Sequence, residues 1–114
     1  MCRIPDQPAN GPVTFTGERY ATRGVSLLLD LQLQQLLWLL IDQIPPEKRD
    51  YLPTFKLTAR FDMKRGILQH IVHQQAAPPF RLEVDFPCYR PVCCNLFVID
   101  DSNGAATMLL TEEY

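Results

Sequence analysis

The sequence lacks an excess of positive charge and a long, uninterrupted apolar segment. Its 114 residues carry 11 basic and 13 acidic side chains, a formal net charge of -2, so there is no overall basic field to attract a nucleic acid. The most apolar stretch, residues 27–44, is broken by aspartate and glutamine, whereas a bilayer span needs roughly 20 predominantly apolar residues. We therefore expect neither a nucleic acid nor a membrane as partner.

A secretory leader and a disulfide framework are also missing. The first six residues, MCRIPD, have no apolar run of the kind that a signal peptide contains. Of the four cysteines, Cys2 stands alone, and Cys88, Cys93 and Cys94 crowd into seven residues, whereas disulfides of small secreted domains tie distant segments together. We expect a cytoplasmic protein with reduced thiols.

The composition is that of a folded domain, with 46% hydrophobic and 21% charged residues. Residues 1–17 contain Pro5, Pro8 and Pro12 and show no apolar periodicity, which predicts an extended or partly mobile leader. A length of this order suits one core. The sequence thus predicts a single α+β domain at residues 18–114.

One amphipathic helix is predicted over residues 30–44. Its apolar positions have the spacing of one helical face, at Leu33, Leu36, Leu37, Leu40, Ile41 and Ile44. Asp30 suits the N-cap, and Pro45 and Pro46 end the helix. Trp38 and Leu39 widen the apolar surface beyond a simple stripe.

Beyond the two prolines the apolar period changes to two, which indicates strands with one buried face. Strands are expected at residues 55–61, 67–74, 80–86, 96–99 and 107–110, with a weaker one at 19–23. Turn signals lie at residues 62–66 and at Asn103-Gly104. The predicted fold is α+β, a mainly antiparallel β-sheet with one amphipathic helix packed on one face.

Several short strings occur in an order that resembles a known family. They are RYATRG at residues 19–24, WLLID at 38–42, DYL at 50–52, IVHQQ at 71–75, VIDD at 98–101 and TMLLTEEY at 107–114. Over roughly residues 18–114 the chain is similar to the DUF960 family, small staphylococcal-type bacterial proteins of unknown function. The resemblance implies a shared fold and a cytoplasmic location, and it brings no activity, substrate or site.

The candidate metal ligands have unsuitable spacing. His70 and His73 would point to opposite faces of a strand, and Cys93-Cys94 are adjacent where structural zinc sites favour Cys-x-x-Cys. In a calcium loop with Gly104 at the sixth position, the first and twelfth ligands would be apolar. We expect no metal and no cofactor, and a turn at residues 100–104.

Catalytic signals are close to background. His73 could pair with Asp100, Asp101 or Glu112, yet no nucleophile elbow, phosphate loop or His-Glu-x-x-His motif occurs. The basic cluster at Lys56, Arg60, Lys64 and Arg65 has no interleaved aromatic residues, so a solvated strand face is favoured over a nucleic-acid platform.

Two functions remain open. The leading hypothesis is a non-catalytic module that binds a protein partner or itself, because Trp38 and Leu39 exceed the helical stripe and the sheet has two edges. Tyr20, Arg23 and Tyr114 would add to its recognition surface. The alternative is a small enzyme or ligand-binding protein with a pocket near His73, Gln75, Asp100 and Asp101.

Overall fold

The computed structural model describes residues 18–50, 52–100 and 105–114. Its elements are β1 (Arg19–Ala21), α1 (Arg23–Leu28), α2 (Leu31–Asp42), η1 (Pro46–Lys48), β2 (Thr54–Asp62), β3 (Gly66–Gln75), β4 (Phe80–Pro87), β5 (Cys94–Asp100), β6 (Ala106–Leu110) and η2 (Thr111–Glu113). The predicted leader at residues 1–17 and the Asn103-Gly104 turn lie outside the described residues.

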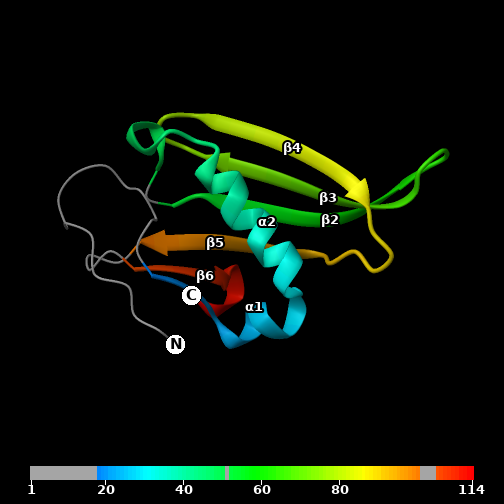
Figure 1. Ribbon diagram of the computed structural model, residues 1–114, viewed down its shortest axis with the longest axis horizontal. Helices are drawn as coiled ribbons and strands as arrows, with labels where there is room; N and C mark the ends of the chain where they lie inside the picture. The colour runs from blue at the N-terminus through cyan, green and yellow to red at the C-terminus, as the bar shows by residue number, and fades with distance from the viewer. Residues whose placement is uncertain (1–17, 51, 101–104) are drawn as a thin grey trace.

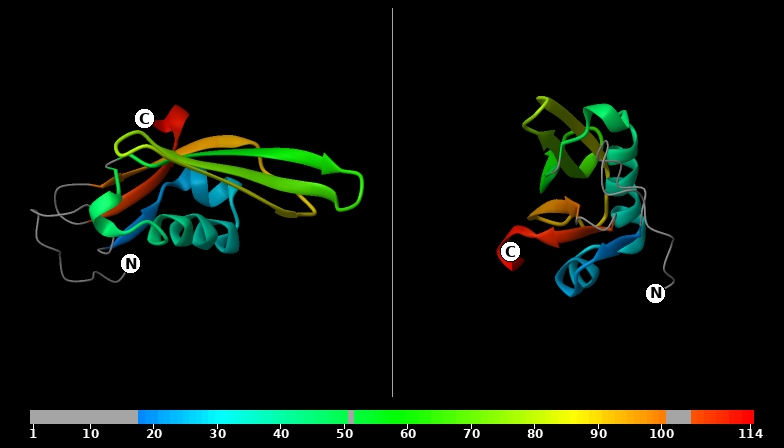
Figure 2. Two further views of the ribbon diagram at one scale, coloured as in Figure 1. Left: turned by 90° about the horizontal axis from the view of Figure 1, so that it is seen from above. Right: turned by 90° about the vertical axis from the view of Figure 1, so that its left-hand side faces the viewer.

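Six strands form one sheet in the order β1-β6-β5-β2-β3-β4 (Figure 1). The β1–β6 pair is parallel, and all the other pairs are antiparallel. Helix α2 packs across one face of this sheet, as the view from above shows (Figure 2). The predicted class, an α+β fold with a mainly antiparallel sheet and one main helix, is confirmed.

Helix α2 begins and ends close to the predicted positions. The Oδ1 atom of Asp30 accepts a hydrogen bond of 2.8 Å from the Leu33 amide, which satisfies one of the free amides of the first turn. The last helical residue is Asp42, followed by Gln43 as the C-cap. Its buried side chains pack against strand residues of β2, β3, β5 and β6 in the main core, at Phe55, Leu57, Ile71, Leu96, Val98 and Met108.

The short helix α1 has no counterpart in the sequence prediction. The Oγ1 atom of Thr22 caps it by accepting a hydrogen bond from the Val25 amide at 3.3 Å. Val25 and Leu29 are buried, whereas Leu27 and Leu28 are exposed. Six residues make fewer than two turns, too few to display a helical period.

The β2–β3 hairpin departs from the predicted pattern of burial. Phe55 and Leu57 lie under α2 and are each 1% exposed, whereas Phe61, on the same face, is 72% exposed. The reason is the length of the hairpin, which projects beyond the end of α2 (Figure 2). The prediction of one continuous buried face over residues 55–61 is therefore wrong for the outer half of β2.

Turn chemistry fixes the end of this hairpin. Asp62 Oδ1 accepts hydrogen bonds from the amides of Lys64, at 2.8 Å, and Arg65, at 2.9 Å. Gly66 follows with a φ of 81°, a conformation that only glycine adopts at little cost. The predicted turn at residues 62–66 is confirmed.

Candidate functional site

His73 lies in the core and does not face solvent. Its exposed fraction is 0%, its ring stacks on Phe55 with centroids 4.5 Å apart, and the edge of Phe80 is 5.5 Å away. Neither ring nitrogen has a hydrogen-bond partner in the described part of the chain. Burial lowers the pKa of His73 to about 4, so the ring is neutral at pH 7.

Gln75 is buried and forms hydrogen bonds with two loops. Its Nε2 atom donates to the carbonyl oxygens of Lys48, at 2.6 Å, and Pro78, at 3.0 Å. Its Oε1 atom accepts from the Asp50 amide at 3.1 Å. The Asp50 carboxylate in turn accepts from the amides of residues 76 and 77. The polar atoms of Gln75 are thus occupied within the chain.

The two aspartates of the predicted pocket are only partly described. Asp100 ends β5, where its backbone pairs with Ala106, and its side chain is outside the described part of the structure. Asp101 also lies outside it. His73 faces the core under α2, so the described residues do not bring it to a cavity with these aspartates.

Trp38 has its face covered by β1. The Arg19 guanidinium carbon lies 4.8 Å from the centroid of the Trp38 ring, within the range of a cation–π contact. Arg19 also forms a salt bridge with Asp42, with 2.5 Å between Nη2 and Oδ1. Leu39, by contrast, is 51% exposed. Part of the extra apolar surface of α2, at Trp38, is therefore covered within the molecule.

The other three predicted recognition residues lie on separate elements. Tyr20 is in β1 opposite Thr107, Arg23 is exposed in the first turn of α1, and Tyr114 is 86% exposed. The Tyr114 ring meets Phe97 edge-on with centroids 5.3 Å apart.

The acidic carboxyl end has a structural role at α1. Glu113 Oε1 accepts hydrogen bonds from the Thr22 hydroxyl, at 2.6 Å, and the Leu110 amide, at 2.8 Å. Its Oε2 atom accepts from the Gly24 amide at 3.2 Å. These hydrogen bonds lower the pKa of Glu113, with the Thr22 hydroxyl as the largest cause. Through these hydrogen bonds, η2 links α1 to the end of β6.

Four exposed apolar side chains lie at or beside the end of the hairpin, in a cluster that we call the knob. Phe61 is paired with Ile67 across the hairpin, and their exposed fractions are 72% and 52%. Met63 in the turn is 92% exposed, and Tyr89 in the β4–β5 connection is 91% exposed. Ile67 and Tyr89 border the same surface hollow. The sequence pattern does not reveal the knob, because it assigns Phe61 to the buried face of a strand.

A groove adjoins the knob between the α1–α2 junction and the β4–β5 connection. It has a volume of about 700 Å³. Its apolar lining comes mainly from Leu27, Leu28, Leu33, Leu36, Phe86 and Val92. Pro87, Cys88 and Arg90 line both this groove and the hollow beside Tyr89. Knob and groove therefore form one continuous surface, which we call the apolar corner.

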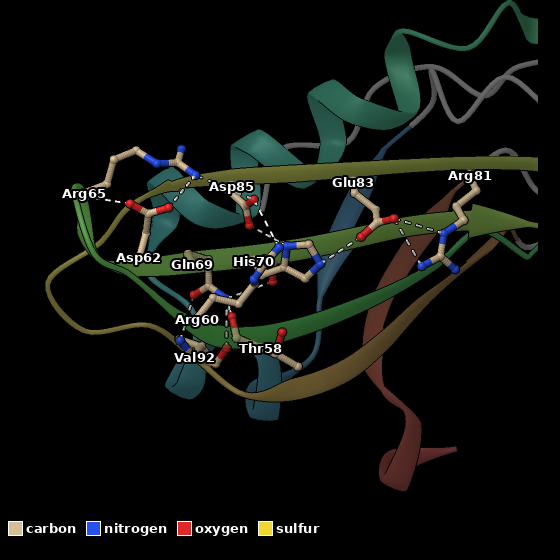
Figure 3. A network of polar contacts seen from close by, with 10 residues as sticks. All are labelled: Thr58, Arg60, Asp62, Arg65, Gln69, His70, Arg81, Glu83, Asp85 and Val92. Atoms are coloured by element: carbon tan, nitrogen blue, oxygen red, sulfur yellow. Dashed lines mark hydrogen bonds and ion pairs between the residues drawn. The ribbon is translucent and has the colours of Figure 1, made fainter.

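Gln69 holds the β4–β5 connection in place beside the groove. It is fully buried, and its Nε2 atom donates to the carbonyl oxygens of Thr58 and Val92, both at 3.0 Å. Its Oε1 atom accepts from the Val92 amide at 2.7 Å. The loop that carries Tyr89 is thus anchored to the sheet by a side chain of β3 (Figure 3).

A polar network covers the face of β2, β3 and β4 that is turned away from α2 (Figure 3). His70 is its centre, with Nδ1 2.5 Å from Asp85 Oδ1 and Nε2 3.1 Å from Glu83 Oε1. Arg60 contacts Asp85 at 3.4 Å, and Arg81 contacts Glu83 at 3.4 Å. The hydrogen bond from His70 is the largest cause that lowers the pKa of Asp85. Part of the predicted basic cluster is thus balanced by carboxylates.

The cysteines of the described chain are free thiols. Cys88 and Cys94 are partly buried and Cys93 is exposed. Burial is the main cause that raises the pKa of Cys94 to about 11, which leaves it protonated at pH 7. Within residues 18–50, 52–100 and 105–114, no three histidine, cysteine or acidic side chains are grouped as metal ligands.

The fold defines the chain as a small α+β domain with a mostly antiparallel sheet. Its sequence matches, over residues 18–113, the family described as "Staphylococcal protein of unknown function (DUF960)". The chain belongs to this family, as the resemblance of its short strings indicates.

A crystal structure of a protein of unknown function from Enterococcus faecalis has a similar fold. The two chains share 27% sequence identity with a TM-score of 0.64, over 89% of this chain and 95% of that one. No curated protein matches this sequence significantly. Among the described residues, no helix is both long and apolar enough to cross a membrane.

Proposed function

We propose that this chain is a non-catalytic interaction domain that binds a second copy of itself through the apolar corner. The observation that carries this proposal is the exposure of the knob, where Phe61, Met63 and Tyr89 are 72%, 92% and 91% exposed. Large apolar side chains gathered on one surface are typical of interaction sites. The hairpin turn and Gln69 hold these side chains on ordered backbone, which limits the entropy lost on binding.

The size of the corner suits a specific interface. Fully covering an aromatic side chain buries roughly 150 to 250 Å², and a standard interface buries about 800 Å² on each partner. Phe61 and Tyr89 alone would supply a substantial part of this area. The exposed leucines beside the groove, Leu27 and Leu28, would add to it.

The shape of the corner favours a second copy as the occupant. A two-fold interface uses the same patch on both partners, so the patch must be self-complementary, and a projection beside a recess meets this requirement. The chain has both side by side, since the knob projects next to a groove of about 700 Å³. The charges of the corner are mixed, since the hairpin turn carries Lys64 and Arg65 and the groove is lined by both Asp30 and Arg90, so shape and not charge supports this pairing.

The exposed edge of β4 is a less suitable interface. It carries Arg81, Glu83 and Asp85 and ends at Pro87. Charges and proline on an edge strand discourage the addition of another strand. The charges and the proline of β4 therefore make this edge of the sheet a less suitable interface than the apolar corner.

The two histidines give little support to the catalytic alternative. His73 is enclosed by aromatic rings, and both ring nitrogens of His70 contact carboxylates. A general base needs access to the proton that it removes. A non-catalytic role fits these environments better.

Light scattering coupled to size-exclusion chromatography tests the proposal. We expect the wild-type chain to elute as a dimer and Phe61→Arg to elute as a monomer with an unchanged circular dichroism spectrum. Leu39→Arg is the matched control, since Leu39 is also an exposed apolar residue, 51% exposed, and lies outside the corner. A monomeric wild type at high concentration, or a dimer that survives Phe61→Arg, would contradict the proposal.

A further inference from the structure

A second surface lies on the face of the sheet opposite α2. The strand register forms three rows there across β2, β3 and β4, namely Thr54–Gln74–Arg81, Lys56–Val72–Glu83 and Thr58–His70–Asp85. Alternate residues of a strand share a face, and directly opposed residues of neighbouring strands are in side-chain contact distance. This surface is separate from the apolar corner.

Two hollows in this surface join end to end. The first has a volume of about 430 Å³ and is lined mainly by Lys56, Thr58, His70 and Glu83. The second has a volume of about 580 Å³. Gln74 and Arg81 line both. Because successive rows lie about 7 Å apart, the joined hollow extends over roughly 13 Å or more.

The two ends of the joined hollow differ in chemistry. One end presents the Lys56 ammonium, the Thr58 hydroxyl and the His70 ring. The other end is lined by Leu52, Pro79 and Phe80, and Arg81 lies where the two meet. Asp50 also lines the apolar end, where its Oδ2 atom accepts hydrogen bonds from the amides of residues 76 and 77.

We propose that the joined hollow binds a small amphiphile with one anionic head group and an apolar body. The carboxylate or phosphate head lies against Lys56, Arg81 and His70, and the apolar body lies against Leu52 and Pro79. Cations that flank a polar hollow and an adjoining apolar wall are the features that such a molecule requires.

Glu83 occupies the position that the anionic head would take. Its carboxylate contacts His70 Nε2 at 3.1 Å and Arg81 Nη2 at 3.4 Å, and its side chain is 50% exposed. The Arg81–Glu83 ion pair is exposed on both sides, at 55% and 50%, and contributes little stability, so an incoming anion can displace Glu83 from Arg81 at low cost. Asp85 holds the other nitrogen of His70 and keeps Nε2 directed toward Glu83 (Figure 3).

Titration of the full-length chain with octanoate, followed by two-dimensional NMR, tests this inference. We expect saturable shifts at residues of the joined hollow, with acetate and octanol each binding about tenfold more weakly because one lacks the body and the other the charge. Hexyl phosphate in a parallel titration distinguishes the two head groups. No saturable shift with either amphiphile, or equal binding of octanol, would overturn the inference.

Three exposed-residue variants sharpen the test. Arg81→Gln should weaken octanoate binding about tenfold, and Glu83→Gln should strengthen it several-fold, because the internal competitor loses its charge. Arg23→Gln is the matched control, since Arg23 is exposed on α1 and lines neither the joined hollow nor the apolar corner, and it should leave the affinity unchanged. Unchanged binding in Arg81→Gln, or weaker binding in Glu83→Gln, would place the ligand elsewhere and refute the assignment.

Discussion

At the scale of single residues, His73 shows how burial decides what a side chain can do. Its type made it a candidate for acid–base chemistry or ligand binding, and its strand position could be read from the apolar alternation. The stacking between Phe55 and Phe80 depends on three strand segments. The residues next to His73 in the sequence do not determine such an enclosure, so the neutral state of His73 could not be predicted from the sequence.

The same enclosure makes the stability of the protein depend on pH. Burial lowers the pKa of His73 from 6.5 to about 4, so between these values the unfolded chain binds a proton that the folded chain does not. The free energy of unfolding should therefore fall as the pH decreases from 6.5, by up to about 1.4 kcal/mol per pH unit. Urea unfolding at pH 7 and at pH 5 measures this loss of unfolding free energy. The loss should be smaller by roughly 2 kcal/mol in His73→Leu than in the wild type. Equal losses in both proteins would contradict the buried neutral state.

Gly24 is a second residue with a specific partner. A Cβ atom at this position would clash with Glu113 Oε2, so Gly24→Ala must displace the carboxylate that binds the Thr22 hydroxyl and the Gly24 amide. We expect the thermal midpoint of Gly24→Ala to fall by a few degrees. In a Glu113→Ala background the same substitution should cost little further, since only the close approach to the Leu110 side chain remains. Additive effects in calorimetry would show that the contact is unimportant.

At the scale of elements, the long regular segments were predictable, whereas the shortest elements and the reach of the hairpin beyond α2 were not. The apolar spacing of α2 and the alternation in the inner half of β2 come from side chains that pack on one core. Helix α1 is too short to display a period, and β1 pairs in parallel with β6 through only three residues. The exposure of Phe61 depends on how far β2 extends past α2, and the strand pattern alone does not encode that distance.

The β4–β5 connection depends on one side chain from another element. Gln69→Leu would keep a similar volume but leave the Val92 amide and carbonyl without their partners. Unpaired buried polar groups cost about 1 to 3 kcal/mol each, so the variant should lose about 2 to 4 kcal/mol in urea unfolding. Amide exchange of residues 88–93 should also become faster. Gln35→Leu, at an exposed position of α2, is the control and should change neither quantity.

At the scale of the whole molecule, the apolar corner arises only when distant segments are folded together. The α1–α2 junction, the end of the hairpin and the β4–β5 connection are separated by tens of residues in the sequence. The sequence did indicate an apolar surplus, which it placed at Trp38 and Leu39. The structure covers the face of Trp38 with Arg19 and leaves the larger exposed cluster at Phe61, Met63 and Tyr89.

The nature of this surface predicts how self-association responds to salt. Interfaces made mainly by exposed charges weaken as ionic strength rises, because screening shortens the range of their attraction. Apolar contacts are not screened, and excluded salts such as sulfate strengthen them. Sedimentation equilibrium should therefore show a dimer affinity that changes little with sodium chloride and rises with sodium sulfate. A steep loss of affinity in sodium chloride would assign the interface to charged residues instead.

The most direct test of self-association through the apolar corner is a dilution series of two-dimensional amide NMR spectra. With increasing protein concentration, we predict progressive shifts at residues 61–67, 87–92 and 27–33, and constant positions for the amides of β1 and β6. Spectra that do not change with concentration, or changes that centre on the β4 edge away from the hairpin, would contradict the account.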